Sequence, residues 1–134
     1  MNIRAACAAI LALTLFGGVC SQAHAQSQAK VARSEKLPNV PGKSVTAVVV
    51  TFPPGAKSPP HHHAGSVLVY VLSGEVRSEN SATGPAKVYK AGETFFEPAG
   101  SAHLVSENVS ATEPATILAV FIADDGATLT TIDH

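Results

Sequence analysis

Residue types that support several common chemistries are missing from most of this chain. The sequence has 134 residues and only two cysteines, Cys7 and Cys20, both near the N-terminus. Residues 26–134 therefore have neither a thiol for nucleophilic catalysis nor a disulfide. No Gly-x-Ser-x-Gly motif and no phosphate-binding glycine loop occurs. Packing or a bound metal must stabilise this part of the protein.

Charge is also scarce. Only 14% of the residues are charged, and the formal net charge is −1. The basic residues form no patch beyond the spacing Lys30, Arg33 and Lys36, and there is no acidic tail. Because a nucleic-acid-binding surface needs clustered positive charge, the sequence predicts no nucleic-acid partner.

The longest apolar run lies at the N-terminus. Met1–Arg4 is a short basic start, residues 5–19 are almost wholly apolar, and residues 23–25 have the A-x-A form of a cleavage site. This pattern predicts a secretory signal peptide over residues 1–25, cleaved before Gln26. The mature protein is then periplasmic or extracellular and not attached to a membrane. An uncleaved anchor is the alternative, but the run is short for a membrane span.

The rest of the chain has the pattern of many short strands. Runs rich in Val, Ile, Thr and Phe alternate with Pro/Gly turns, and no long run has helical periodicity. Strands are expected over residues 45–52, 67–72, 75–79, 86–89, 94–97, 103–107, 116–123 and 129–132. This pattern predicts an all-β sandwich or barrel, formed by one domain over residues 45–134. Residues 26–44 form an N-terminal tail, which could pair along a sheet edge.

Histidine is concentrated in one stretch. His61, His62 and His63 follow the pair Pro59-Pro60. Side chains alternate between the two faces of a strand, so His61 and His63 point to one side and His62 to the other. Imidazole is the commonest side-chain metal ligand near neutral pH. His103, at the start of a later strand, can complete the set across an antiparallel neighbour, which predicts a metal site at His61, His63 and His103.

Two glycine- and histidine-containing motifs resemble those of the cupin family. They are Gly55, five residues, His61-x-His63 and then Gly74, and Gly92, five residues, Pro98-x-Gly100, two residues and His103. The resemblance implies a single conical antiparallel β-barrel of the jelly-roll type, with a divalent metal bound inside by the motif histidines. It also implies a small-molecule ligand or substrate and a homodimer. By strict count, the asparagine that closes the second motif falls at Glu107, with Asn108 beside it.

The first motif departs from the family pattern at Val67. Cupins usually carry a glutamate at that place, four residues after the second histidine of the motif. Without it, the ligands are reduced to His61, His63 and His103. Their neutral imidazoles suit Fe, Zn, Cu or Ni better than Mn. Open coordination positions would remain for water, dioxygen or substrate.

Glu97, directly before Pro98, is the other candidate for chemistry. It could be a fourth metal ligand, a hydrogen-bonding partner of a ligand histidine or a general base. If Phe96 faces the core, however, alternation turns Glu97 away from it, towards solvent. This alternation favours a surface role for Glu97.

Two classes of function stay open at the level of sequence. The first is a metal-dependent dioxygenase or isomerase acting on a small oxygenated substrate, which the three histidines without a fourth ligand favour. The second is a non-catalytic module that binds a small ligand or the metal itself. The departure at Val67 and the absence of an evident acid/base residue favour this module.

Overall fold

The computed structural model describes residues 25–134, which form β-strands and no helix. The predicted signal peptide lies, apart from its last residue, outside the described residues. Within residues 25–134, no helix is long and apolar enough to span a bilayer. The strands are β1 (Gln28–Lys36), β2 (Lys43–Phe52), β3 (Lys57–Ser58), β4 (His61–His63), β5 (Ser66–Ser73), β6 (Glu75–Asn80), β7 (Gly84–Lys90), β8 (Thr94–Glu97), β9 (Ala102–Asn108), β10 (Ala115–Asp124) and β11 (Thr130–Ile132).

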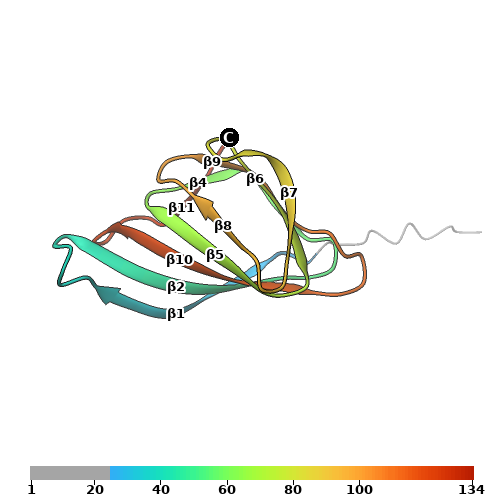
Figure 1. The fold of residues 1–134 in the computed structure, drawn as a ribbon, viewed down its shortest axis with the longest axis horizontal. Coiled ribbons are helices and arrows are strands. Elements are labelled where there is room, and N and C mark those ends of the chain that lie inside the picture. The colour runs from blue at the N-terminus through green and yellow to red at the C-terminus, as the bar shows by residue number, and fades with distance from the viewer. Residues whose placement is uncertain (1–24) are drawn as a thin grey trace, which may run out of the picture.

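The strands form two antiparallel sheets (Figure 1). One has the order β1-β2-β10-β5-β8, and the other has the order β11-β4-β9-β6-β7, with β3 also paired to β9. Strands far apart in sequence, such as β2 and β10, are neighbours, as in jelly-roll folds. The predicted all-β antiparallel barrel is confirmed in this two-sheet form.

A strand also forms within residues 26–44. β1 pairs antiparallel with β2 at the edge of the first sheet, with a register shift between Val31 and Arg33. Its nine residues are all exposed, so no apolar alternation marks it in the sequence. The sheet therefore extends into the segment that composition alone describes as a tail.

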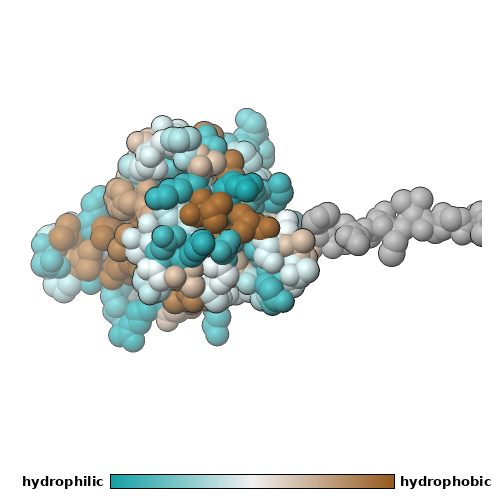
Figure 2. Space-filling model, turned by 45° about the vertical axis from the view of Figure 1, so that its right-hand side comes forward, coloured by the Kyte–Doolittle hydropathy of each residue, from teal (hydrophilic) through white to brown (hydrophobic). Residues whose placement is uncertain are grey.

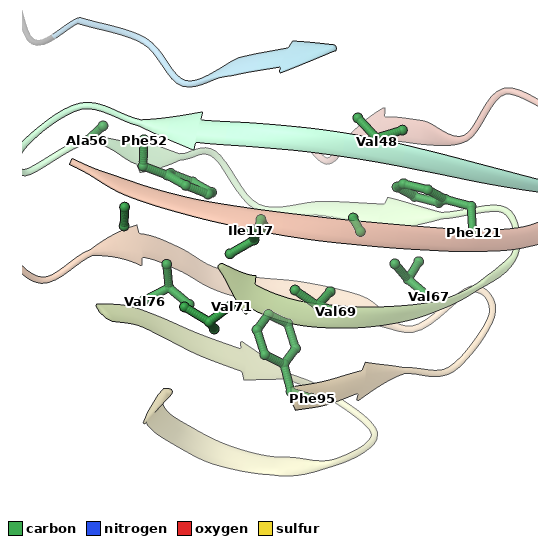
Figure 3. Close-up of a cluster of buried hydrophobic side chains, with 12 residues drawn as sticks. Val48, Phe52, Ala56, Val67, Val69, Val71, Val76, Phe95, Ile117 and Phe121 are labelled. Carbon is green, nitrogen blue, oxygen red and sulfur yellow. The ribbon is translucent and has the colours of Figure 1, made fainter. Parts of the chain in front are cut away.

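The hydrophobic core lies between the two sheets (Figure 3). On β5, Val67, Val69 and Val71 are buried, whereas the residues between them are exposed. This period of two is expected for a strand with one face on the core. Each buried valine contributes about 1.5 to 3 kcal/mol to folding. The inward face of β5 is therefore fixed by packing, and Val67 belongs to it.

Phe95 and Phe96 show which face of β8 is buried. Phe95 lies opposite buried Val69, whereas Phe96 lies opposite exposed Leu68. Phe96 is 48% exposed and does not face the core. Figure 2 shows one hydrophobic patch near the middle of the molecule, bordered by hydrophilic residues, and a further hydrophobic area at its left end. The inward positions of β8 are thus the odd-numbered ones, Phe95 and Glu97.

Asn108 joins three chain segments at the end of β9. Its Nδ2 donates to the carbonyl oxygens of residues 52–53 (3.3 and 3.1 Å) and of Glu113 (2.7 Å). Its Oδ1 accepts from the Ser110 backbone N–H at 2.9 Å. The side chain is 4% exposed, so water cannot replace these bonds. Asn108, and not its neighbour Glu107, holds these segments together.

Glu107 has a different role. Its carboxylate accepts hydrogen bonds from Lys57 Nζ (2.8 Å) and Arg77 Nη1 (2.6 Å), which links β3, β6 and β9. The hydrogen bond from Lys57 lowers the pKa of Glu107 below its ordinary value, and Arg77 adds to this against the opposing effect of burial. The Lys57 and Arg77 side chains are 72% and 46% exposed, so together the pairs contribute only about 1 kcal/mol.

Gly65 permits a close approach between two strands beside the histidine stretch. A Cβ atom built at Gly65 would lie 2.6 Å from the Ala123 Cβ and still closer to the Ile122 carbonyl oxygen. Neither atom can move without disturbing β10, so only glycine fits. The corner between β4 and β5 therefore depends on the missing side chain.

Candidate metal centre

β4 presents the histidine stretch between β11 and β9. His61 and His63 are 8% and 6% exposed. His62 points to the opposite side, where its side chain is 41% exposed and its Nδ1 lies 2.6 Å from Asp133 Oδ1. Strand alternation thus turns two of these three histidines inward and one outward, as the sequence predicts.

His103 reaches the same point from the neighbouring strand. In the β4–β9 pairing, His61 lies directly opposite His103. The His61 ring centroid is 4.9 Å from that of His103 and 4.8 Å from that of His63. One ring nitrogen of each of the three residues lies within 4.8 Å of the others. The fold therefore brings together the three histidines that the sequence singles out.

Hydrogen bonds to carbonyl groups define the tautomers of two of these rings. His61 Nδ1–H donates to the Pro59 carbonyl oxygen (2.8 Å), and His63 Nδ1–H donates to that of Leu129 (3.0 Å). A carbonyl can only accept, so the proton is on Nδ1 and each Nε2 has a free lone pair. Burial lowers the pKa of both His61 and His63. Both rings are therefore held in the neutral form that binds metals.

Glu97 is buried, which corrects the surface role favoured by the sequence. It is 2% exposed, and its Oε2 lies 2.9 Å from His103 Nδ1 and 3.7 Å from His63 Nε2. The expectation was wrong because Phe95, not Phe96, faces the core, so the same alternation turns Glu97 inward. Burial alone would raise the pKa of Glu97, but the adjacent His103 and then His63 outweigh it and lower the pKa. Glu97 is therefore a carboxylate at neutral pH.

Ser78 on β6 is a partner of the site that the sequence analysis did not single out. Its Oγ lies 2.9 Å from His103 Nε2, and both side chains are buried. A signal was present in the sequence, because Ser78 is two residues after the apolar Val76 and therefore shares its face of the strand. The structure buries Val76, Ser78 and Asn80 on that face. Ser78 thus belongs to the inward face of its strand.

The three histidines line a cavity of about 430 Å³. This volume suits a small ligand. Among the described residues that line it, Glu97 is the only acid, and there is no lysine or arginine. The Phe121 ring packs edge-on against His63, with the centroids 5.1 Å apart. Most of the wall is apolar and includes Val48, Phe52, Val67, Ile117, Ala119 and Phe121.

Comparison with known proteins agrees with the motifs. A family model described as a cupin domain matches residues 48–121. The chain belongs to the cupin family. A relative of this cupin, germin-like protein subfamily 2 member 2 of Arabidopsis thaliana, is 34% identical over 94 residues, which are 67% of this chain. These residues cover 42% of the relative, so the cupin spans less than half the length of that protein.

Solved structures show the same fold. One is an uncharacterized conserved protein with a double-stranded β-helix domain from Klebsiella pneumoniae, with a TM-score of 0.63 at 22% identity. The match covers 81% of this cupin and 85% of that chain. Recombinant oxalate oxidase in complex with glycolate has a TM-score of 0.56 at 27% identity, and the match covers 66% of this chain and 45% of the oxidase.

The donor set fits a divalent transition metal. Imidazole nitrogen suits Fe, Zn, Cu and Ni, and a carboxylate oxygen broadens the range towards Mn. His61 and His63 are neutral, are oriented by carbonyl groups and have lone pairs available, which a metal ligand requires. The residues around the cavity are therefore a candidate metal centre.

Proposed function

We propose that this cupin binds a divalent transition metal through His61, His63 and His103 and catalyses a reaction of a small molecule held in the adjoining cavity. The observation behind the proposal is that three buried imidazoles converge on the cavity of about 430 Å³. A bound metal would polarise an oxygen atom of the substrate or, if it is redox-active, activate dioxygen. The reaction that we expect is a dioxygenation or an isomerisation of the substrate.

The side chains that line the cavity limit which kinds of substrate it can bind. The apolar wall excludes water and binds the apolar part of the molecule. Because no lysine or arginine among the described residues lines the cavity, a substrate with several negative charges would have the metal as its only cationic partner. A small, mainly apolar molecule with one or two oxygen donors fits best, such as a diketone or a phenol. The similarity to oxalate oxidase in complex with glycolate supports a small oxygenated substrate.

A binding module without turnover is the second candidate. The observation that favours it is the scarcity of proton-transfer groups, because Glu97 and the histidines are the only titratable side chains among the described residues that line the cavity. In that case, a ligand would raise the melting temperature of the metal-loaded protein without forming a product. Turnover that is lost in His63→Ala would exclude this candidate.

The test begins with the full-length chain, expressed so that it can be exported, and with elemental analysis of the purified protein. We expect about one equivalent of metal per chain, and oxygen uptake or isomerisation with small diketones, phenols or thiols. His61→Ala combined with His103→Ala should remove the metal. His62→Ala is the matched control, because that side chain points away from the cavity, and it should retain the metal. Metal retained at full stoichiometry in the double variant would refute the assigned site.

Export and dimerisation belong to the same proposal. Mass spectrometry of the purified protein should show an N-terminus at Gln26, in agreement with a signal peptide over residues 1–25. Light scattering of the purified protein in solution should give the mass of a homodimer. A mass that includes residues 1–25 would refute cleavage, and a monomer mass would refute dimerisation.

A further inference from the structure

Glu97 lies beside Val67, the position at which the first cupin motif of this chain lacks its usual carboxylate. In the β5–β8 pairing, Glu97 lies directly opposite Val67. The two residues are 2% and 1% exposed, so both point into the same inner layer. Side chains that are directly opposite on neighbouring strands have Cβ atoms about 5 Å apart. A carboxylate on β8 can therefore reach the space that a glutamate at residue 67 of β5 would reach.

Two buried atoms near this position have no hydrogen-bond partner. They are Glu97 Oε2 and His103 Nδ1, which are 2.9 Å apart but are not aligned as donor and acceptor. The other ring nitrogen of His103, Nε2, already has a partner in Ser78 Oγ. When Nε2–H donates to that hydroxyl, Nδ1 presents a lone pair towards the carboxylate. In this tautomer the two electron-rich atoms repel each other, and a cation bound between them removes the repulsion.

The distances agree with two atoms that share one ion. Ligands that are each about 2.1 Å from a divalent metal lie about 3.0 Å apart at right angles and about 3.4 Å apart in a tetrahedron. Glu97 Oε2 is 2.9 Å from His103 Nδ1 and 3.7 Å from His63 Nε2. Both separations are close to those of neighbouring ligands. The ligand atoms within 4.8 Å of one another are those of the three histidines, so the Glu97 side chain has to shift to join them.

The charge around Glu97 leads to the same conclusion. Among the described residues, the ion pairs of Glu97 are with His63 and His103 and with no lysine or arginine. A carboxylate that is 2% exposed and has only imidazoles beside it is costly to bury unless a cation joins the group. A divalent metal supplies that cation and is what the three histidines would bind.

We propose that Glu97 is a fourth protein ligand of the metal and supplies from β8 the carboxylate that Val67 does not supply from β5. This inference rests on the proposed function, because it assumes that the histidines bind a metal. It restores a site of three histidines and one carboxylate with one negative charge. Manganese, which the loss at Val67 disfavours, thereby becomes an acceptable metal alongside iron.

The experiment compares metal affinities in the full-length protein by competition with chelators for Mn²⁺, Co²⁺ and Zn²⁺. Glu97→Gln keeps the shape of the side chain and removes its charge. We expect the affinity for Mn²⁺ to fall at least about 100-fold and that for Zn²⁺ about 10-fold. The visible absorption bands of bound Co²⁺ should change because one ligand is lost. Glu93→Gln is the matched control, since that residue is exposed in the turn before β8, and it should change neither readout.

A swap of the two positions tests the equivalence of the strands. Val67→Glu combined with Glu97→Val returns the carboxylate to β5, and we expect it to regain most of the Mn²⁺ affinity that Glu97→Gln loses. The single variant decides the ligand assignment even if the swapped protein fails to fold. A Glu97→Gln protein with affinities within threefold of the original and an unchanged Co²⁺ spectrum would overturn it.

Other outcomes separate this inference from the proposed function. If Glu97→Gln binds more weakly but its saturated Co²⁺ spectrum is unchanged, Glu97 only positions His103, and the inference fails while the histidine site stands. If the unaltered protein binds no metal, or if metal remains after His61→Ala and His103→Ala are combined, the proposed function fails first. The histidine variants thus test the metal site, and Glu97→Gln tests its fourth ligand.

Discussion

Removal of the Ser78 hydroxyl should weaken the metal centre without changing the fold. Ser78 Oγ lies 2.9 Å from His103 Nε2, and the two residues are 6% and 4% exposed. Ser78→Ala removes this bond and leaves a buried ring nitrogen without its partner. The bond contributes about 1 kcal/mol, and an unsatisfied buried donor costs about 1 to 3 kcal/mol. Because the His103 ring then loses one of the groups that orient it, we expect metal affinity to fall about 10-fold.

Two measurements check this prediction. Chelator competition with Co²⁺ and Zn²⁺ gives the change in affinity. Thermal unfolding followed by circular dichroism, with the metal removed by chelator, gives the change in the free energy of unfolding. A loss of about 1 to 2 kcal/mol corresponds to a fall of about 4 to 8 °C in melting temperature for a domain of this size. The melting temperature tests the hydrogen bond even if no metal binds.

Ser106→Ala is the matched control. Ser106 lies opposite Ser78 on β9 and lines the cavity beside the histidines, but it is not the partner of His103. It should bind metal within about twofold of the unaltered protein. An equal loss of affinity in the two serine variants would show that cavity polarity matters and not the bond to His103. A Ser78→Ala protein with unchanged affinity and melting temperature would refute the reasoning directly.

Three further changes test the fold around the site by thermal unfolding. Asn108→Ala removes at least three hydrogen bonds and should destabilise the protein by about 3 kcal/mol, whereas Asn39→Ala in an exposed turn should have almost no effect. Gly65→Ala should prevent soluble expression or lower the melting temperature by more than about 12 °C. Gly42→Ala, with a positive φ but nothing close to its Cβ, should cost only about 1 kcal/mol. Glu107→Gln should lower the melting temperature by about 4 °C at pH 7. Because the pKa of Glu107 is lowered in the folded state, this difference should shrink as the pH falls below its ordinary value of 4.5. Equal effects within either control pair, or a Glu107 difference that persists in acid, would contradict these assignments.

The convergence of the three histidines could be predicted because its signal is local. His61 and His63 are two residues apart, so any extended backbone places them on one face. His103 follows a Pro-x-Gly turn at a spacing typical of the family, and the register of β4 with β9 places it opposite His61. The all-β class is likewise local, since it follows from short β-branched runs and frequent turns. Prediction succeeded where neighbouring residues define both the strand and its inward face.

Glu97 could not be placed in this way. Two consecutive phenylalanines, Phe95 and Phe96, precede it. Alternation of side chains along the strand is equally compatible with either of them facing the core. The partner strand decides which phenylalanine faces inward, because Val69 is buried opposite Phe95 and Leu68 is exposed opposite Phe96. Val69 and Leu68 come 26 and 28 residues before their partners in the sequence, so the choice depends on the β5–β8 register. The edge pairing of residues 26–44 was foreseen as a possibility, but the bounds of β1 could not be predicted, because its exposed residues carry no pattern of burial.

The position of Glu97 also changes what the first motif can reveal about a cupin. A metal does not distinguish between carboxylates by their place in the sequence; it requires an oxygen in the inner layer within reach of the histidines. Val67 and Glu97 are equivalent in that respect, because they are directly paired and both buried. Exchanging them conserves one valine and one carboxylate in the layer, so neither packing volume nor net charge changes. The absence of glutamate at residue 67 is therefore weak evidence for a site of three histidines alone, and the inward residues of β8 must be considered together with those of β5 before a metal is assigned.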